Sequence, residues 1–184
     1  MVPGPSSNGK SGMERLWFAA QANLPSKIFA GSFFRRGLRS PGLLRKWKRA
    51  SAGIFGGVMG AVDSNVLVRL VVGDNQSQTA AAEAFIEQGA WVSLLALTET
   101  IWVLKAVYGR SAGDLAATLE MLLDHGSLVF QDSEAVAAAV RLFRLRPALG
   151  FSDCLMLELA RKAGHLPLGT FDRKLGRAEG AQQL

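Results

Sequence analysis

From residue 59 to residue 184, short apolar runs alternate with longer segments in which apolar residues recur at helical spacing. Short apolar runs are typical of buried strands, and the longer period is typical of amphipathic helices. The pattern predicts strands at 60–63, 91–95, 128–131 and 166–170. It predicts helices at 64–72, 78–89, 97–109, 111–126, 133–146 and 152–164. Strands that alternate with helices in this order indicate an α/β fold built around a parallel sheet.

Residues 1–58 lack this periodicity and differ in charge from the rest of the chain. They contain ten Lys and Arg residues and one acidic residue, which gives a net charge of +9. Residues 59–184 contain eleven Lys and Arg residues and fourteen acidic residues, which gives a net charge of −3. We therefore expect a poorly structured basic N-terminal extension, 1–58, followed by one domain, 59–184. Three origins of the extension remain open: a native start at Met59, a basic arm for nucleic acid or an anionic surface, and a transit peptide.

A phosphate-binding motif occurs within the extension but lacks its structural setting. The segment "GPSSNGKS", residues 4–11, matches G-x-x-x-x-G-K-[ST] in full. A working loop of this kind follows a strand that aims its backbone N–H groups at phosphates, and only "MVP" precedes Gly4. We do not expect a nucleotide site there.

The overall composition predicts a soluble globular protein. Hydrophobic residues make up 49% of the chain and charged residues 20%, and no apolar run is long enough to span a bilayer. A single cysteine, Cys154, excludes an internal disulfide and is typical of a reducing compartment. We therefore expect a cytoplasmic protein without a membrane segment.

Four acids stand apart from the others, which occupy polar helix faces: Asp63, Glu99, Asp153 and Asp172. The three aspartates could simply cap helices. Glu99 interrupts a predicted helix of mostly apolar residues, where a buried unpaired carboxylate would be costly. Glu158 lies four residues before Lys162, so a surface ion pair between them is expected.

The predicted sheet gives the aspartates a shared location. The carboxyl ends of parallel strands and the starts of the following helices meet at one edge, so Asp63, Asp153 and Asp172 should converge there. Clustered carboxylates repel one another unless a cation neutralises them, and an oxygen-only set suits Mg²⁺ or Mn²⁺ better than zinc. The two histidines, His125 and His165, are isolated from this set and are interpreted as structural.

Four segments resemble the sequence blocks of PIN-domain ribonucleases, in particular the VapC toxins of type II toxin-antitoxin modules. The segments are "AVDSNVLVRLV", "LLALTETIWVLKAVYG", "ALGFSDCLMLELARKAG" and "LPLGTFDRKL". The resemblance covers 59–184 and implies a PIN-like parallel-sheet sandwich with helices on both faces. It also implies an endoribonuclease that requires Mg²⁺ or Mn²⁺, a cognate VapB-type antitoxin as inhibitor, and a homodimer.

The resemblance also assigns roles to individual residues. It implies four metal ligands, which are also the catalytic residues: Asp63, Glu99, Asp153 and Asp172. It implies two supporting residues that orient carboxylates or water, Asn65 and Thr170. Arg69, Arg110, Arg173 and Lys174 are candidates for contacts with backbone phosphates.

Two other functions are alternatives to a nuclease. The first is a PIN-like module that binds RNA or protein without cleaving it. Such a module would be indicated by the loss of one or more of the four acids, and all four are present. The second is an aspartyl phosphatase of the haloacid dehalogenase type. That chemistry needs an acid two residues after Asp63, where this chain has Asn65, so the sequence argues against it.

Overall fold

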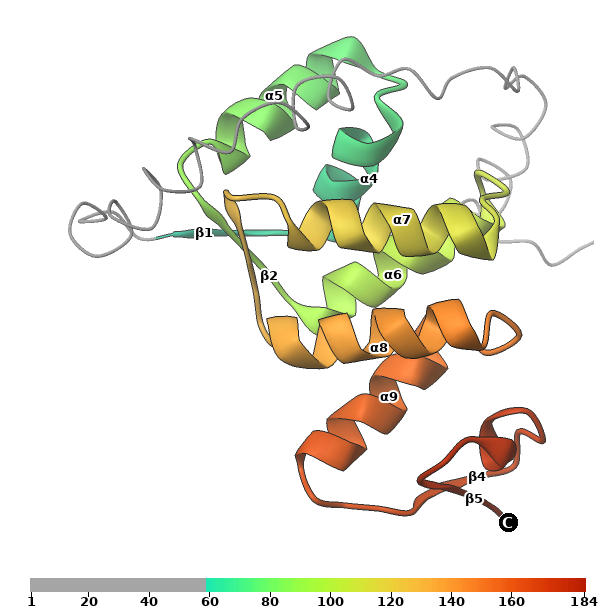
Figure 1. Cartoon of the computed structure of the whole chain (residues 1–184). Helices are drawn as coiled ribbons and strands as arrows, with labels where there is room; N and C mark the ends of the chain where they lie inside the picture. The colour runs from blue at the N-terminus through green and yellow to red at the C-terminus, as the bar shows by residue number, and fades with distance from the viewer. Residues whose placement is uncertain (1–58) are drawn as a thin grey trace, which may run out of the picture. The chain divides into compact units, whose positions relative to one another are not determined.

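The computed structural model describes residues 59–184, and the basic extension with its "GPSSNGKS" motif lies outside the described residues. Within residues 59–184, five short strands and six helices follow one another, with a short 3₁₀ helix between the last two strands (Figure 1). The strands are β1 (Gly60–Val62), β2 (Ala90–Val92), β3 (Leu128–Phe130), β4 (Leu168–Thr170) and β5 (Ala181–Gln183). The helices are α4 (Ser64–Val72), α5 (Gln76–Ile86), α6 (Leu94–Ala106), α7 (Ala112–Leu123), α8 (Ser133–Leu145), α9 (Phe151–Lys162) and the 3₁₀ helix η1 (Leu175–Arg177).

The strands form two separate parallel sheets. The first has the order β1-β2-β3, with Ala61 opposite Trp91 and Trp91 opposite Val129. The second pairs β4 with β5. The predicted α/β class with a parallel sheet is confirmed, but the strand at 168–170 does not join the sheet of the other three. The strand β5 was not predicted.

Local side-chain caps explain where most helices begin. Five helices begin after a residue whose side chain accepts a hydrogen bond from the backbone N–H three residues later. These capping residues are Asp63, Asn75, Ser93, Ser111 and Asp132. Such caps satisfy N–H groups that have no partner inside the helix. The cap at Ser93 starts α6 at Leu94, so the predicted strand 91–95 was wrong beyond Val92.

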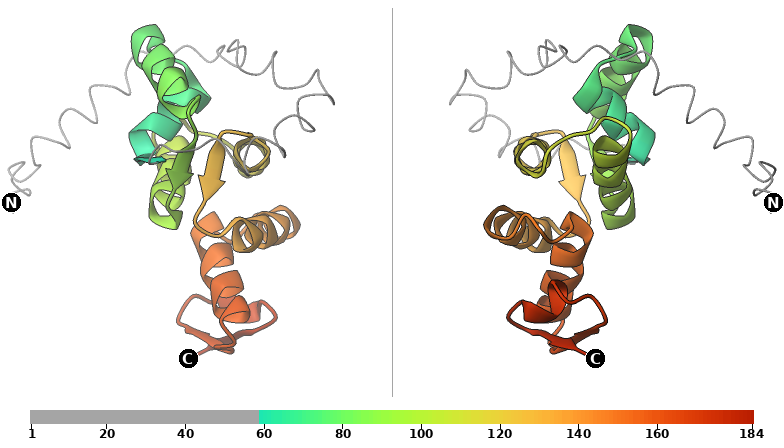
Figure 2. Two further views of the ribbon diagram at one scale, coloured as in Figure 1. Left: turned by 90° about the vertical axis from the view of Figure 1, so that its left-hand side faces the viewer. Right: turned by 90° about the vertical axis from the view of Figure 1, so that its right-hand side faces the viewer.

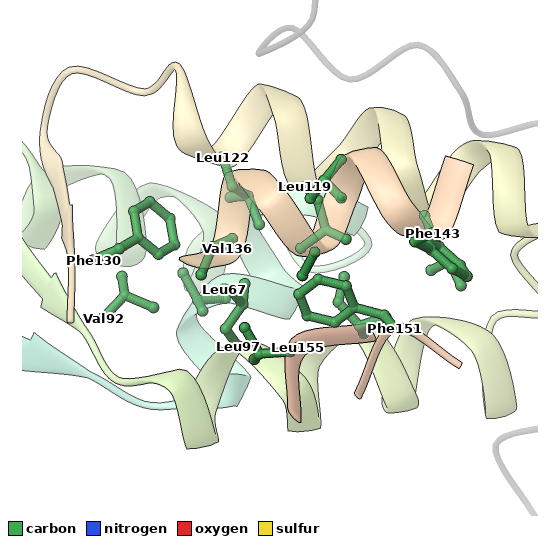
Figure 3. Close-up of a cluster of buried hydrophobic side chains, with 14 of the residues drawn as sticks. Leu67, Val92, Leu97, Leu119, Leu122, Phe130, Val136, Phe143, Phe151 and Leu155 are labelled. Carbon is green, nitrogen blue, oxygen red and sulfur yellow. The ribbon is translucent and has the colours of Figure 1, made fainter. Parts of the chain in front are cut away.

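The hydrophobic core lies between one face of the three-stranded sheet and the helices (Figure 3). Val92 and Phe130 from the sheet pack with leucines of α4, α6 and α7, and residues with the opposite strand orientation, Trp91 and Val129, remain exposed. Phe85 of α5 lies so close to β1 that a Cβ on Gly60 would come within 2.6 Å of its ring. A larger residue at this position would require the exposed ring of Phe85 to move.

Helices α8 and α9 form an antiparallel pair that is held at both ends. Phe143 and Phe151 pack edge to face at 6.3 Å near one end. Near the other end, Lys162 lies 2.8 Å from Asp132 and 2.9 Å from Glu134. The expected pair between Glu158 and Lys162 was therefore wrong: Glu158 instead faces Arg161, at 3.5 Å, because Lys162 is engaged by the start of α8.

The C-terminal segment, residues 166–184, packs against the α8–α9 pair. Leu175 and Ala178 are buried in the core. Arg146 donates a hydrogen bond to the carbonyl of Arg177 (3.0 Å), and Arg161 donates one to the carbonyl of Glu179 (2.8 Å). Both views of Figure 2 show this segment beyond α9, on the side away from β3. These contacts explain why β4 lies apart from the three-stranded sheet.

Among residues 59–184, no helix has the length and apolarity needed to cross a membrane.

Candidate active site

Asp63 follows β1 directly and caps helix α4. Its Oδ1 accepts a hydrogen bond from the backbone N–H of Val66 (3.0 Å), and its Oδ2 lies 3.5 Å from the Nδ2 of Asn65. The side chain is exposed to solvent. The predicted capping role is confirmed, and Asn65 is close enough to orient the second carboxylate oxygen.

Asp172 occupies the corresponding place after β4. Its Oδ1 accepts hydrogen bonds from the backbone N–H groups of Leu175 (3.0 Å) and Lys174 (2.6 Å). These two bonds hold the pKa of Asp172 below its usual value. Thr170 Oγ1 accepts a hydrogen bond from the backbone N–H of Asp172 (3.0 Å), so Thr170 positions this residue through the main chain.

Asp153 lies in the first turn of α9, where its Oδ2 accepts a hydrogen bond from the backbone N–H of Gly150 (3.0 Å). The start of α9 lies against α6. Thr98 and Trp102 of α6 and Ser152 of α9 line the same small pocket, which has a volume of about 120 Å³. This arrangement brings the segment that carries Asp153 next to the helix that carries Glu99.

Glu99 is exposed, contrary to the expectation of a largely buried helix around it. It makes no hydrogen bond or ion pair with another described residue. It shares one face of α6 with Leu95 and Trp102, which are 77% and 58% exposed. The cost of burying an unpaired carboxylate therefore does not arise, and Glu99 serves no visible structural purpose.

The three aspartates have one feature in common. Each commits one carboxylate oxygen to the backbone N–H groups of its own turn and leaves the other oxygen without a backbone partner. A carboxylate held in this way has a fixed orientation, and its other oxygen can still bind a cation. Capping and ligand binding are therefore compatible at Asp63, Asp153 and Asp172.

The expected convergence of the acids is absent within one chain. Among the described residues, no group of three or more His, Cys, Asp or Glu side chains could hold a metal ion. Asp172 follows a strand of the second sheet, which packs on α8 and α9, whereas Asp63 follows a strand of the first. Carboxylate oxygens are suitable ligands for a divalent ion, but the four acids do not come close enough together within one chain to bind it.

A comparison with protein families matches the PIN domain to residues 61–181, more than half of the chain. The chain belongs to the PIN domain family. PIN domains are generally metal-dependent nucleases, and this family assigns the chain a nuclease-type function. No curated protein and no solved structure matched the chain.

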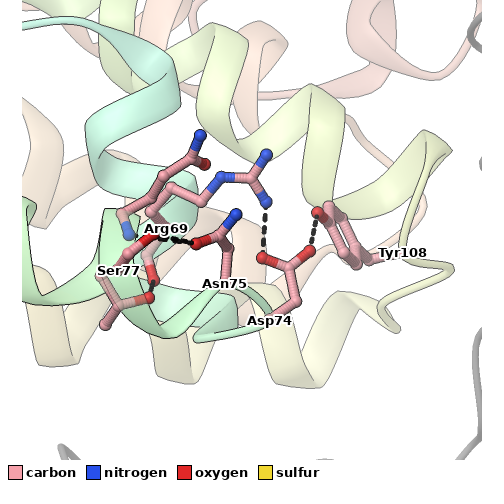
Figure 4. Close-up of polar contacts among 7 residues, drawn as sticks. Arg69, Asp74, Asn75, Ser77 and Tyr108 are labelled. Atoms are coloured by element: carbon pink, nitrogen blue, oxygen red, sulfur yellow. Dashed lines mark hydrogen bonds and ion pairs between the residues drawn. The ribbon is translucent and has the colours of Figure 1, made fainter.

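A polar network in this PIN domain was not predicted from the sequence. Asp74 accepts a hydrogen bond from Arg69 through Oδ1 and one from the Tyr108 hydroxyl through Oδ2 (2.9 Å) (Figure 4). Burial, followed by the hydrogen bond to Asp74, raises the pKa of Tyr108. Arg69, a candidate phosphate contact, is therefore engaged by an acid that joins α4 to the end of α6.

An open pocket of about 500 Å³ lies between α4 and α5, and it is lined in part by Asn65, whose Nδ2 lies 3.5 Å from Asp63 Oδ2. Its polar lining comes from Asn65, Arg69 and Gln78. Its apolar lining includes Phe85, whose side chain is exposed. The pocket thus joins the surroundings of Asp63 to an aromatic surface.

Proposed function

We propose that this PIN domain is a Mg²⁺- or Mn²⁺-dependent endoribonuclease whose activity resides in residues 59–184. The observation that carries the proposal is the shared state of Asp63, Asp153 and Asp172: each is oriented by backbone N–H groups and keeps one oxygen available. A structural cap needs only the bonded oxygen. Membership of the PIN family supports the interpretation of the other oxygens as ligands.

Each residue of the proposed site has a distinct task. Asp63, Glu99, Asp153 and Asp172 would supply oxygens to the metal, Asn65 would orient Asp63, and Thr170 would position Asp172. A divalent ion, when bound to such a set, supplies positive charge that offsets charge developing on the phosphodiester and helps to activate water. The backbone hydrogen bonds that lower the pKa of Asp172 favour its ionised form, which is the form that binds a metal ion.

The surroundings of the aspartates are suited to RNA. Arg173 and Lys174 directly follow Asp172 and are exposed, so they can contact backbone phosphates. The pocket lined by Asn65 offers the exposed ring of Phe85 as a stacking surface for an unpaired base. A single-stranded substrate would place a base in this pocket and its phosphates near the acids.

We also propose that the protein is the toxin of a type II toxin-antitoxin module, inhibited by a VapB-type antitoxin and assembled as a homodimer. The support is the resemblance of the four sequence blocks to VapC toxins. Co-expression with the product of a small neighbouring reading frame tests the partner: we expect a stable complex in which RNA cleavage is suppressed.

The nuclease proposal is tested with the purified full chain and one sequence supplied as single-stranded RNA and as single-stranded DNA. We expect RNA cleavage in Mg²⁺ or Mn²⁺, none in excess EDTA, and none by Asp63→Asn. The matched control is Asp124→Asn, which changes an exposed acid at the end of α7 and should cleave normally. Full cleavage in EDTA would contradict metal dependence, and RNA binding without cleavage would favour the non-cleaving module.

A further inference from the structure

Four described strands, the end strands β1, β3, β4 and β5, each have one edge that pairs with no other described strand, and β1 and β4 are the two that lead into Asp63 and Asp172. β1 pairs only with β2, and β4 pairs only with β5, among the described residues. A two-stranded sheet is marginal on its own, and parallel strands are normally buried by further structure. The residues of β4 and β5 are half-buried or exposed, whereas alternate residues of β2 and β3 are buried. The C-terminal segment therefore lacks the cover that such strands usually have.

The chain itself holds the C-terminal segment at its present position. Leu175 is buried in the core, and hydrogen bonds from Arg146 and Arg161 fix the carbonyls of Arg177 and Glu179. Helix α9, to which the segment is attached, is in turn held along α8 at both ends. Moving β4 to the open edge of β1 in the same chain would break these contacts or pull α9 from the core.

Exposed apolar side chains lie next to β1 and β4 or elsewhere on the sheets to which these two strands belong. Met59 precedes β1, and Trp91 lies on the exposed face of the same sheet. On the C-terminal segment, Phe171 is 81% exposed just after β4, and Leu184 is 66% exposed just after β5. Burial of such side chains is favourable, and exposed apolar groups at strand edges mark surfaces that bind another chain.

We infer that two copies of this protein exchange their C-terminal segments, so that β4 of each copy pairs in parallel with β1 of the other. Two copies pair both β1 edges with both β4 edges in a closed two-fold arrangement, and the outer edges of β3 and β5 then become the ends of each continuous sheet. No third component is needed. The occupant of the open β1 edge is therefore β4 of a second copy of this chain.

The exchange also completes the acid cluster, and in this respect the inference rests on the proposed function. Asp63 ends β1 and Asp172 follows β4. When the two strands are parallel neighbours, their carboxyl ends lie at the same edge of one continuous sheet. Asp172 of one copy then joins Asp63 of the other, and each active site contains residues of both chains.

Complementation between two inactive variants tests this arrangement. Asp63→Asn and Asp172→Asn, each expressed alone, should not cleave RNA. Co-expressed with different tags and purified through both, the mixed dimer has one site with both substitutions and one with neither. We expect the doubly purified mixed dimer to regain about half of wild-type activity, because one of its two sites is intact. No recovery, with active wild type, would overturn the inference.

A cross-linking experiment tests the exchange without any need for activity. Ala61→Cys and Gly169→Cys are placed on separate, differently tagged full-length chains, at the centres of β1 and β4. A Cβ on Gly169 would meet only the Leu184 side chain, at 3.4 Å, so the substitution fits. Neighbouring strands lie about 5 Å apart, so we expect a disulfide between the two tagged chains. The control, Gln182→Cys on β5, lies one strand farther away and should not cross-link to Ala61→Cys.

The two experiments separate failure of the inference from failure of the proposed function. Cross-linking between chains with no RNA cleavage by the wild type would support the exchange and reject the nuclease. Cleavage by the wild type without complementation or cross-linking would reject the exchange. A disulfide that forms within one chain carrying both cysteines, in a monomeric protein, would also overturn the inference.

Discussion

Glu99 has two possible roles: it is either a metal ligand or a solvated acid outside the active site. It is exposed and unpaired among the described residues, and it lies between Leu95 and Trp102 on one face of α6. An exposed carboxylate contributes little to stability, so any large effect of its removal must come from function.

We expect Glu99→Gln to leave the unfolding midpoint unchanged or slightly raised, because the carboxylate that it replaces is exposed and makes no stabilising contact with another described residue. RNA cleavage in Mg²⁺ should fall by orders of magnitude, because the amide is a poor ligand for a divalent ion. The measurement pairs thermal unfolding with initial cleavage rates on the full chain.

The control for this substitution is Glu120→Gln, which removes an exposed acid of α7 that pairs with Arg144. That pair is exposed on both sides, so its loss should change cleavage little. Cleavage by Glu99→Gln at the wild-type rate would show that Glu99 is a solvated acid outside the site.

Helix α9 links the core to the candidate site, and its first turn is the critical part. Phe151 opens the helix, is buried, and packs against Phe143 of α8. Asp153 lies two residues later, so the packing of Phe151 also fixes the position of this acid. The hydrophobic anchor and the proposed ligand are therefore joined by a single helical turn.

We predict that Phe151→Ala lowers the free energy of unfolding by about 3 to 5 kcal/mol, the usual cost of removing a buried phenyl ring. Leu145→Ala is the matched control, because Leu145 ends α8 but is 80% exposed. It should change stability by less than about 0.5 kcal/mol. Chemical denaturation monitored by circular dichroism measures both, and equal effects would contradict the anchoring role of Phe151.

The assembly of the entire protein should be visible in the way that metal stabilises it. A ligand that binds only the folded state stabilises it by about 2.7 kcal/mol at about one hundred times its Kd. If each site takes Asp63 from one copy and Asp172 from another, the metal also stabilises the dimer. The stabilisation then depends on protein concentration.

We expect Mg²⁺ or Mn²⁺ to raise the melting temperature, with a shift that grows as protein concentration is raised through the dimerisation range. Asp172→Asn should reduce the shift, because it removes one ligand from every site. Thermal unfolding at several protein concentrations, with and without metal, measures this. A shift of constant size at all concentrations would indicate that the site closes within one chain.

Much of the local structure was predictable because it depends on neighbours in the sequence. Asp63 and Asp132 cap helices through N–H groups three residues away, and the apolar periods of α4 and α8 match their buried faces. Two errors in the predicted strands also have local causes. A side chain cap at Ser93 ended the second predicted strand early, and β5, with the sequence "AQQ", has no apolar run that would reveal a strand.

The identity of the candidate acids could also be predicted, because Asp63, Asp153 and Asp172 each follow a strand or open a helix in the sequence itself. Which of these acids lie close together in the folded protein could not be predicted. It depends on contacts between distant residues, such as the burial of Leu175 and the hydrogen bond from Arg146 to Arg177. The network that joins Asp74 to Tyr108 across 34 positions is of the same kind.

The amino-acid pattern thus determined which segments become helices and strands, and which acids stand at their ends, since those outcomes depend on hydrogen bonds and side-chain periods within a few residues. The folded arrangement alone determined that the strands divide into two sheets and that Asp63 and Asp172 lie on different ones. The physical reason is that sheet pairing competes with packing on α8 and α9. The balance is set by many weak contacts between residues far apart in the chain, which no local pattern encodes.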